Sequence, residues 1–183
     1  MKKIDIRLSD ESTKLLAALK GKPLQSYCHE EFHYTNTSSQ VAKLIALDGG
    51  ELYVYSFVEP QDYFGTEEEV AVWMVSQERL PLMNHKKLVE VPVGETVKDV
   101  LIVQENQKVF CDGEQTYDVW LTRGIIFDFG NRQVAFEKDV WFSEEIIIHK
   151  GYNLIASFKP KELFGKDWNK EYRTECFREI LRV

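Results

Sequence analysis

The chain has few cysteines and no long apolar run, and both absences limit what it can be. Its 183 residues include three cysteines, Cys28, Cys111 and Cys176, which are widely separated and form no C-x-x-C pair. A disulfide framework or a four-cysteine zinc site is therefore not expected, and a reducing, cytoplasmic location is predicted. No apolar stretch approaches the roughly 20 residues of a membrane-spanning helix, so no membrane partner is expected. Residues 1–7 are charged with no apolar segment behind them, which predicts that a secretory signal is absent.

The chain also lacks the glycine-rich and serine-centred motifs that mark common enzyme classes. It contains no P-loop, no G-x-G-x-x-G and no G-x-S-x-G, whose glycines bind phosphates or hold a nucleophile on a tight turn. This absence favours a non-enzymatic role. Hydrophobic residues make up 44% of the chain and aromatic residues 13%, so the chain has enough apolar material for a globular core.

Acidic residues are concentrated in the middle of the chain. Residues 51–150 carry nineteen Asp or Glu against nine Lys or Arg, whereas residues 1–50 and 151–183 are mildly basic. Negative charge repels phosphate, so direct nucleic-acid binding through the middle is not expected. The charge split is compatible with a basic protein partner, with pairing between the middle and the two ends of the chain itself, and with acids that only form the solvent side of half-buried strands.

The apolar pattern predicts one α+β domain over residues 1–183. A strand and a capped helix are expected within residues 1–40, and a strand-rich core, mostly antiparallel β-sheet or a partly closed barrel, within 41–160. Clear hairpins surround Asp48-Gly49-Gly50 and Gly130-Asn131, since Asp-Gly and Gly-Asn suit tight turns. Residues 78–99 contain Pro81, Pro92 and Gly94 and are predicted to be a long irregular connection.

The last segment, 161–183, is predicted to be an amphipathic helix packed on the sheet. Trp168, Tyr172, Cys176 and Ile180 recur every four residues, which is close to one helical turn. Leu154 to Ala156 is predicted to be a strand just before this segment. Residues 50–65 and 151–165 share a pattern of strand, Ser-Phe, Pro, acid and Phe-Gly, and this similarity suggests two related strand-and-turn units.

One segment has the spacing of a catalytic metal site. Residues 29–33 read His-Glu-Glu-Phe-His, which resembles the H-E-x-x-H signature of zinc peptidases. On a helix, residues four apart share a face, so the resemblance implies His29 and His33 as zinc ligands and Glu30 as the general base. The same segment also scans as a strand, on which the two histidines would lie about 13 Å apart, too far for one metal ion.

Three functions follow from these features. The leading prediction is a non-enzymatic protein-binding module, of the inhibitor, immunity or mobile-element accessory type, that presents an acidic face to a basic partner and binds no cofactor. The first alternative is a zinc-dependent hydrolase that uses His29, Glu30 and His33. The second is a small-ligand-binding β domain, because the predicted strands carry several aromatic residues, for which core packing is the competing interpretation: Tyr53, Tyr55, Phe57, Trp73 and Trp120. Homo-oligomerisation is compatible with all three.

Overall fold

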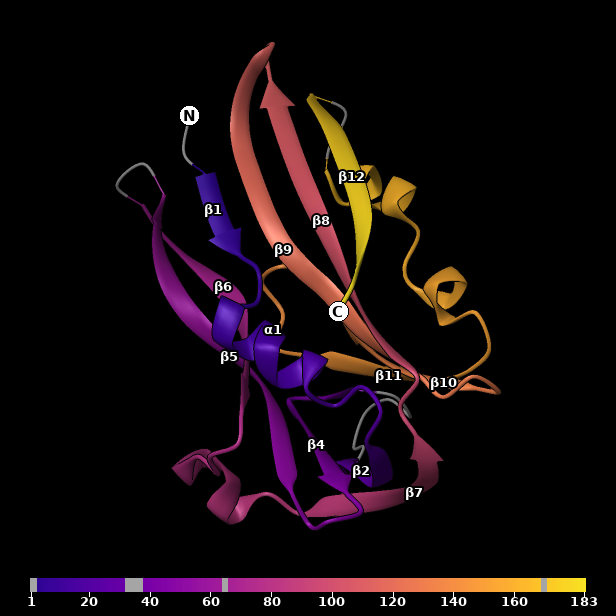
Figure 1. Cartoon of the computed structure of the whole chain (residues 1–183). Helices are drawn as coiled ribbons and strands as arrows, with labels where there is room; N and C mark the ends of the chain where they lie inside the picture. The colour runs from indigo at the N-terminus through magenta and orange to yellow at the C-terminus, as the bar shows by residue number, and fades with distance from the viewer. Residues whose placement is uncertain (1–2, 32–37, 64–65, 169–170) are drawn as a thin grey trace.

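The computed structural model describes residues 3–31, 38–63, 66–168 and 171–183, which form two β-sheets and a few short helices (Figure 1). Sheet A contains β1 (Lys3–Ile6), β3 (Ser38–Ser39), β8 (Asp99–Cys111), β9 (Glu114–Asp128), β10 (Gln133–Lys138), β11 (Ile146–Gly151) and β12 (Tyr172–Arg182). Sheet B contains β2 (Pro23–Glu30), β4 (Val41–Ala46), β5 (Glu51–Tyr63), β6 (Thr66–Ser76) and β7 (Leu88–Thr96). The helical elements are α1 (Asp10–Ala17) and the 3₁₀ turns η1 (Pro81–His85), η2 (Leu154–Ser157) and η3 (Lys161–Asp167).

The sheets are almost entirely antiparallel, as predicted, but they do not close into a barrel. Sheet A has the order β12-β8-β9-β10-β11-β3, and sheet B has the order β6-β5-β4-β2-β7. Within the described residues, the parallel pair is β1 with the first half of β9, and the second half of β9 pairs with β10 on the same edge. The two predicted hairpins are confirmed as β4–β5 and β9–β10.

The main hydrophobic core lies between the two sheets. Its side chains come from β2, β4, β5 and β6 on one side and from β8, β9, β10 and β11 on the other. Tyr27 of sheet B meets Phe136 of sheet A edge to face, with ring centroids 6.2 Å apart. Because alternate side chains of a strand point to opposite faces, sheet A presents a second row of residues on its other face, where the pocket described below lies.

The predicted N-terminal strand and helix are confirmed. Ser9 caps α1, and its hydroxyl oxygen accepts a hydrogen bond of 3.1 Å from the Ser12 backbone N–H. Leu16 and Leu19 join the core between the sheets, so α1 lies at the side of that core (Figure 1).

Strands β8 and β9 form a long hairpin that carries Gln107 and Arg123 of the pocket described below. Asp112 and Gly113 both have positive φ angles, 51° and 84°, as a tight two-residue hairpin turn requires. Farther along, Val103 pairs with Gly124 while Gln104 pairs with Thr122. Arg123 is therefore an extra residue in β9, and such a bulge redirects a side chain.

The predicted C-terminal helix is wrong, because residues 172–182 form the edge strand β12 beside β8. A spacing of four fits a strand as well as a helix, since residues two and four apart share a strand face. Within β12, Tyr172, Thr174 and Cys176 are half-buried while Arg173, Glu175 and Phe177 are exposed. The period is thus two, not 3.6.

Two other predictions are also wrong. Residues 78–99 contain η1 and the regular strand β7, which accommodates Pro92 because β7 is an edge strand and its register with β2 shifts there. Leu154 to Ala156 is the 3₁₀ turn η2, entered through Asn153 at a positive φ of 49°. Residues 51–63 form a long strand whereas 154–165 are largely 3₁₀ turns, so the suggested repeat does not exist in the described structure.

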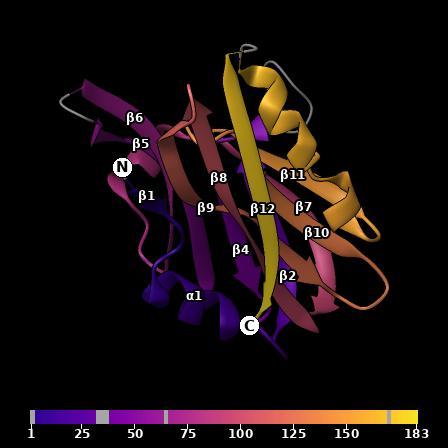
Figure 2. The same ribbon diagram turned by 90° about the horizontal axis from the view of Figure 1, so that it is seen from above.

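Two stretches on either side of β11, residues 139–145 and 152–168, cover the second face of sheet A and together are called the covering segment. The coiled ribbons drawn in orange beside β12 and β11 are η2 and η3 (Figures 1 and 2). Leu154 and Phe158 pack against Val103, Ile126 and Ala135. Among the described residues, no helix is long and apolar enough to cross a membrane.

Candidate functional site

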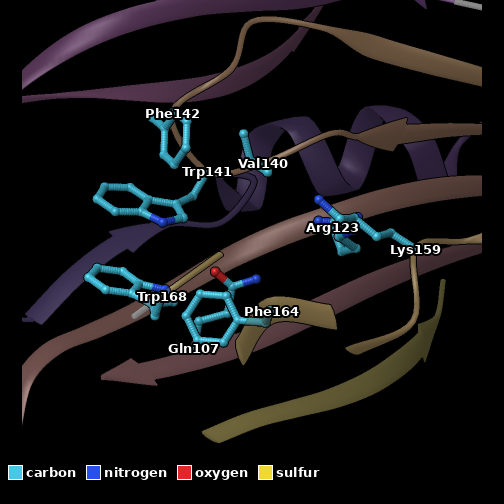
Figure 3. Close-up of a pocket in the computed structure, with 8 residues that line it drawn as sticks. All are labelled: Gln107, Arg123, Val140, Trp141, Phe142, Lys159, Phe164 and Trp168. Atoms are coloured by element: carbon cyan, nitrogen blue, oxygen red, sulfur yellow. The ribbon is translucent and has the colours of Figure 1, made fainter. Parts of the chain in front are cut away.

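A pocket of about 140 Å³ lies between sheet A and the covering segment, residues 139–145 and 152–168 (Figure 3). Trp141 and Phe142 come from the β10–β11 connection, Phe164 comes from η3, and Trp168 follows η3 directly. The backbone N–H of Ala71 in β6 donates a 2.8 Å hydrogen bond to the Trp141 carbonyl. This bond ties the connection to sheet B and holds the Trp141 side chain over sheet A.

Aromatic rings form most of the pocket wall. The Trp141 ring packs against Phe142 at 5.5 Å and an 80° interplanar angle, and Phe164 packs against Trp168 at 6.3 Å and 73°. Tyr117 lies behind both indoles, 5.6 Å from Trp141 and 5.5 Å from Trp168. Phe142 is 58% exposed, whereas Trp141 is buried. Such a wall binds planar apolar groups well.

Gln107 provides a polar group on the pocket lining. Its side chain is 4% exposed, and its Nε2 donates a 2.8 Å hydrogen bond to Glu105 Oε2. Among the described residues, no protein group donates to Gln107 Oε1. Figure 3 shows this oxygen directed toward the side of the pocket that holds the two indoles. A buried carbonyl oxygen without a donor is costly, so this atom is a candidate ligand contact.

Arg123 and Lys159 line the opposite end of the pocket (Figure 3). The Arg123 guanidinium is anchored, because its Nη2 donates to Glu137 Oε1 at 2.8 Å and its Nη1 donates to the Asp139 carbonyl at 2.8 Å. Glu137 Oε1 also accepts the Lys159 backbone N–H at 2.7 Å. The Arg123 guanidinium at this end of the pocket is therefore held in place by the Glu137 carboxylate and the Asp139 carbonyl.

The buried carboxylate of Glu137 is the centre of this polar cluster. It accepts hydrogen bonds from Arg123 on one oxygen and faces His149 Nε2 at 2.7 Å on the other. Burial raises the pKa of Glu137, but the hydrogen bond from His149 and the charge of Arg123 outweigh burial and hold the pKa below its usual value. Glu137 is thus an anion that fixes its neighbours, not a proton donor.

A second buried ion pair lies beside Gln107. Arg178 of β12 donates through Nε to Glu105 Oε1 at 2.7 Å, and through Nη2 to the Lys159 carbonyl at 2.6 Å. Burial and the neighbouring Glu105 raise the pKa of Cys176 to about 12. The Cys176 thiol is therefore protonated at neutral pH and is a poor nucleophile.

The predicted zinc residues lie elsewhere. His29 and Glu30 are on β2, where neighbouring side chains point to opposite faces, so the helix on which the zinc-peptidase signature depends is not formed at these residues. Glu30 accepts hydrogen bonds from Lys86 Nζ at 2.6 Å and the Gln40 backbone N–H at 2.8 Å. His33 lies outside the described residues. Within them, no group of three or more His, Cys, Asp or Glu could hold a metal ion, and the zinc hypothesis stays a prediction.

The aromatic residues that suggested a ligand-binding domain mostly pack in the core. Tyr53, Tyr55 and Trp73 are buried, and the rings of Tyr53 and Tyr55 stack 5.6 Å apart. The pocket is built instead from aromatic residues of irregular segments, Trp141, Phe142, Phe164 and Trp168. Trp141, Phe142 and Phe164 follow no strand or helix periodicity in the sequence, and Trp168 was assigned to the stripe of the predicted C-terminal helix, so no sequence pattern indicated the pocket. Gln107 was not identified from the sequence either, because Gln104 to Lys108 is a polar stretch that looks like an interruption between two strands.

Part of the excess acid is neutralised within the molecule. Asp99 pairs with Lys20 and Arg182, and Glu105 pairs with Arg178. The basic groups of these pairs all belong to the two ends of the chain, so the predicted pairing of the middle with the ends is found in part.

Comparison with protein-family models, with curated proteins and with solved structures gives no match. The function must therefore be argued from the site itself.

Proposed function

We propose that this protein is a non-enzymatic β-domain protein that binds a small aromatic ligand in the pocket over sheet A. The observation that carries the proposal is the position of the buried Gln107 carbonyl oxygen, without a donor among the described residues, inside a wall of aromatic rings. Apolar pockets with a few convergent polar groups are typical ligand sites. The buried ion pairs below the pocket keep its walls in place.

Nuclear magnetic resonance of the indole N–H groups tests this proposal directly. The chain has four tryptophans, of which Trp141 and Trp168 line the pocket whereas Trp73 and Trp120 do not. Titration with toluene or phenol is expected to shift the Trp141 and Trp168 signals saturably and leave the Trp73 and Trp120 signals in place. No saturable shift, or equal shifts of all four signals, would overturn the proposal.

A matched pair of variants provides the control. Trp168→Ala removes one wall of the pocket, and its ligand affinity is expected to fall at least tenfold. Trp120→Phe changes a tryptophan that packs beneath Arg7, with the guanidinium carbon 4.8 Å from the ring centroid, and its affinity is expected to equal that of the wild type. Equal affinity of both variants would argue against the pocket as the binding site.

A second candidate is the protein-binding role predicted from charge. Strand β5 pairs with β4 as far as Tyr55, and beyond that residue β5 and β6 continue as a two-stranded hairpin. In this hairpin Asp62 lies opposite Glu67, and Glu69 lies on the same face. These three exposed acids support an interaction with a basic partner surface.

Charge-matched variants test this second candidate with a lysine-rich peptide as the probe. Neutralising Asp62, Glu67 and Glu69 together is expected to abolish salt-sensitive binding of the peptide. Neutralising Glu78, Glu90 and Glu145, which are also exposed, changes the net charge equally and is expected to have a smaller effect. The same loss in both triple variants would show a non-specific charge effect and remove this candidate.

A further inference from the structure

The orientation of the Gln107 amide is set by its neighbours. Glu105 is paired with Arg178, so its carboxylate is an acceptor and does not donate. Of the two ends of the Gln107 amide, only the N–H₂ group can donate a hydrogen bond to Glu105 Oε2, which lies 2.8 Å from Nε2. The carbonyl oxygen is therefore held away from Glu105 and toward the pocket (Figure 3), where it offers an acceptor that cannot be exchanged for a donor by a flip of the amide.

The charges on the pocket lining limit the kind of donor that Gln107 can accept from. Arg123 and Lys159 are the charged residues on the lining, and both are cationic. Arg123 is already paired with Glu137, and no carboxylate among the described residues lines the pocket. A ligand ammonium group would therefore be buried without a counter-charge, which is costly. The remaining donors are neutral, namely the O–H of a phenol-like ring or the N–H of a pyrrole-like ring.

The volume of the pocket sets an upper limit on the size of the ligand group that it can enclose. A dry apolar cavity of about 150 Å³ accepts one benzene molecule, and this pocket has about 140 Å³. One aromatic ring therefore fills it.

We propose that the ligand group bound here is a single aromatic ring carrying one neutral O–H or N–H, and that Gln107 selects it by accepting that hydrogen bond. This inference rests on the proposed ligand-binding function. The group belongs either to a free small molecule or to an exposed side chain such as tyrosine, which presents the same chemistry. A ring that lacks the donor leaves the Gln107 oxygen buried and unsatisfied, which costs affinity.

A comparison of phenol with toluene tests the contribution of the donor apart from that of the ring, because the two compounds differ only in one substituent of nearly equal size. Each dissociation constant is measured from the Trp168 indole signal, and the quantity compared is the ratio of the toluene to the phenol constant. In Gln107→Leu this ratio is expected to fall about tenfold relative to wild type, because the acceptor is lost. Gln104→Leu makes the same change on β8 at a buried glutamine that does not line the pocket, and its ratio is expected to be unchanged.

The outcomes distinguish this inference from the function on which it rests. If neither compound binds, the proposed function is overturned. If both compounds bind and the ratio of the toluene to the phenol dissociation constant in Gln107→Leu equals that of wild type, ligand binding in the pocket is supported and the proposed selection by Gln107 is wrong.

A measurement on wild-type protein keeps the test valid if Gln107→Leu does not fold. The Gln107 side-chain carbonyl ¹³C signal is expected to shift with phenol and not with toluene, and equal shifts would overturn the inference. Titration with N-acetyl-tyrosine amide in place of phenol then separates a side-chain source from a free ligand. Binding at least as tight as that of phenol indicates a tyrosine of a partner, and exclusion indicates a free phenol-like molecule.

Discussion

Arg178 and Glu105 face each other across neighbouring strands, with Arg178 Nε 2.7 Å from Glu105 Oε1. They are register partners of β12 and β8, and the same carboxylate binds the Gln107 amide at 2.8 Å. A basic residue from the C-terminal segment thus neutralises an acid of the middle segment and fixes the residue that we propose contacts the ligand. The pocket depends on β12 through this pair.

The first prediction concerns the buried Glu137. Glu137→Gln is expected to lower the free energy of unfolding by about 3–5 kcal/mol, because it leaves the Arg123 guanidinium buried without a counter-charge. Urea denaturation followed by fluorescence measures the change. Glu175→Gln removes one partner of an exposed pair with Arg173 and is expected to change stability by less than about 1 kcal/mol. Similar losses in the two variants would contradict the importance of burial.

The second prediction is the acid dependence of the same residue. The pKa of Glu137 is lowered in the folded protein by His149 and Arg123, which outweigh the opposing effect of burial. Its stabilisation is therefore present above the carboxyl pKa of the unfolded chain, and it is lost as pH falls through the lower folded pKa. The stability difference between wild type and Glu137→Gln should shrink as pH falls below about 4.5. A stability difference that does not change with pH would show that the charged form of Glu137 is not the source of the stabilisation.

The third prediction concerns Lys138, which points between the two sheets. Its Nζ donates to the Ala71 carbonyl at 2.5 Å and lies 5.1 Å from the Trp73 ring centroid. Burial, followed by the charge of Arg123, lowers the pKa of Lys138 from 10.5 to about 7. The unfolded chain thus binds an extra proton between these values, so this group makes stability rise with pH in that window.

Comparison with Lys138→Met isolates this effect. Between pH 7 and 10.5 the stability of wild type relative to the variant is expected to increase, by at most about 1.4 kcal/mol per pH unit. Denaturation at several pH values checks it. A constant or decreasing difference would show that Lys138 keeps its charge in the folded protein.

The fourth prediction concerns Gly124, beneath the covering segment. A Cβ at this position would lie 2.4 Å from the Phe136 carbonyl oxygen and 2.6 Å from the Phe158 ring. Gly124→Ala is expected to displace Phe158, to destabilise the protein by about 1–3 kcal/mol, and to weaken ligand binding in the adjacent pocket. Thermal denaturation and phenol titration measure the two effects. Gly50→Ala, where the nearest atom is an exposed Asp48 oxygen at 3.2 Å, is the control, and equal effects at both sites would contradict the close packing.

The strands and the first helix were predictable because their signals are local. Ile4 and Ile6 alternate with polar residues, Ser9 supplies a cap, and Asp48-Gly49-Gly50 supplies a turn, so each pattern is readable within a few residues. Strand β12 was mispredicted because a spacing of four satisfies both a helix and a strand. Residues 172–182 form a strand because they pair with the edge of β8. The presence of that edge cannot be read from the sequence of 172–182.

The pocket was not predictable because its residues have no common period or motif. Gln107 is polar in a polar stretch, Trp141 lies in the connection between β10 and β11, and Phe164 lies in the 3₁₀ turn η3. These residues come together only because the covering segment passes over sheet A. The H-E-x-x-H spacing, by contrast, was visible in the sequence, but it lies on a strand at His29 and Glu30.

The sequence alone determined a strand-rich α+β chain with an acidic middle, because alternation, turn residues and composition are properties of neighbouring residues. Tertiary structure alone decided which acids are buried and paired. Glu105 and Glu137 look like the other acids of residues 51–150, yet they lie under the covering segment opposite Arg178 and Arg123. It also decided that Gln107 keeps a carbonyl oxygen without a donor among the described residues. Burial and pairing depend on contacts between residues far apart in the chain, and such contacts leave no local pattern.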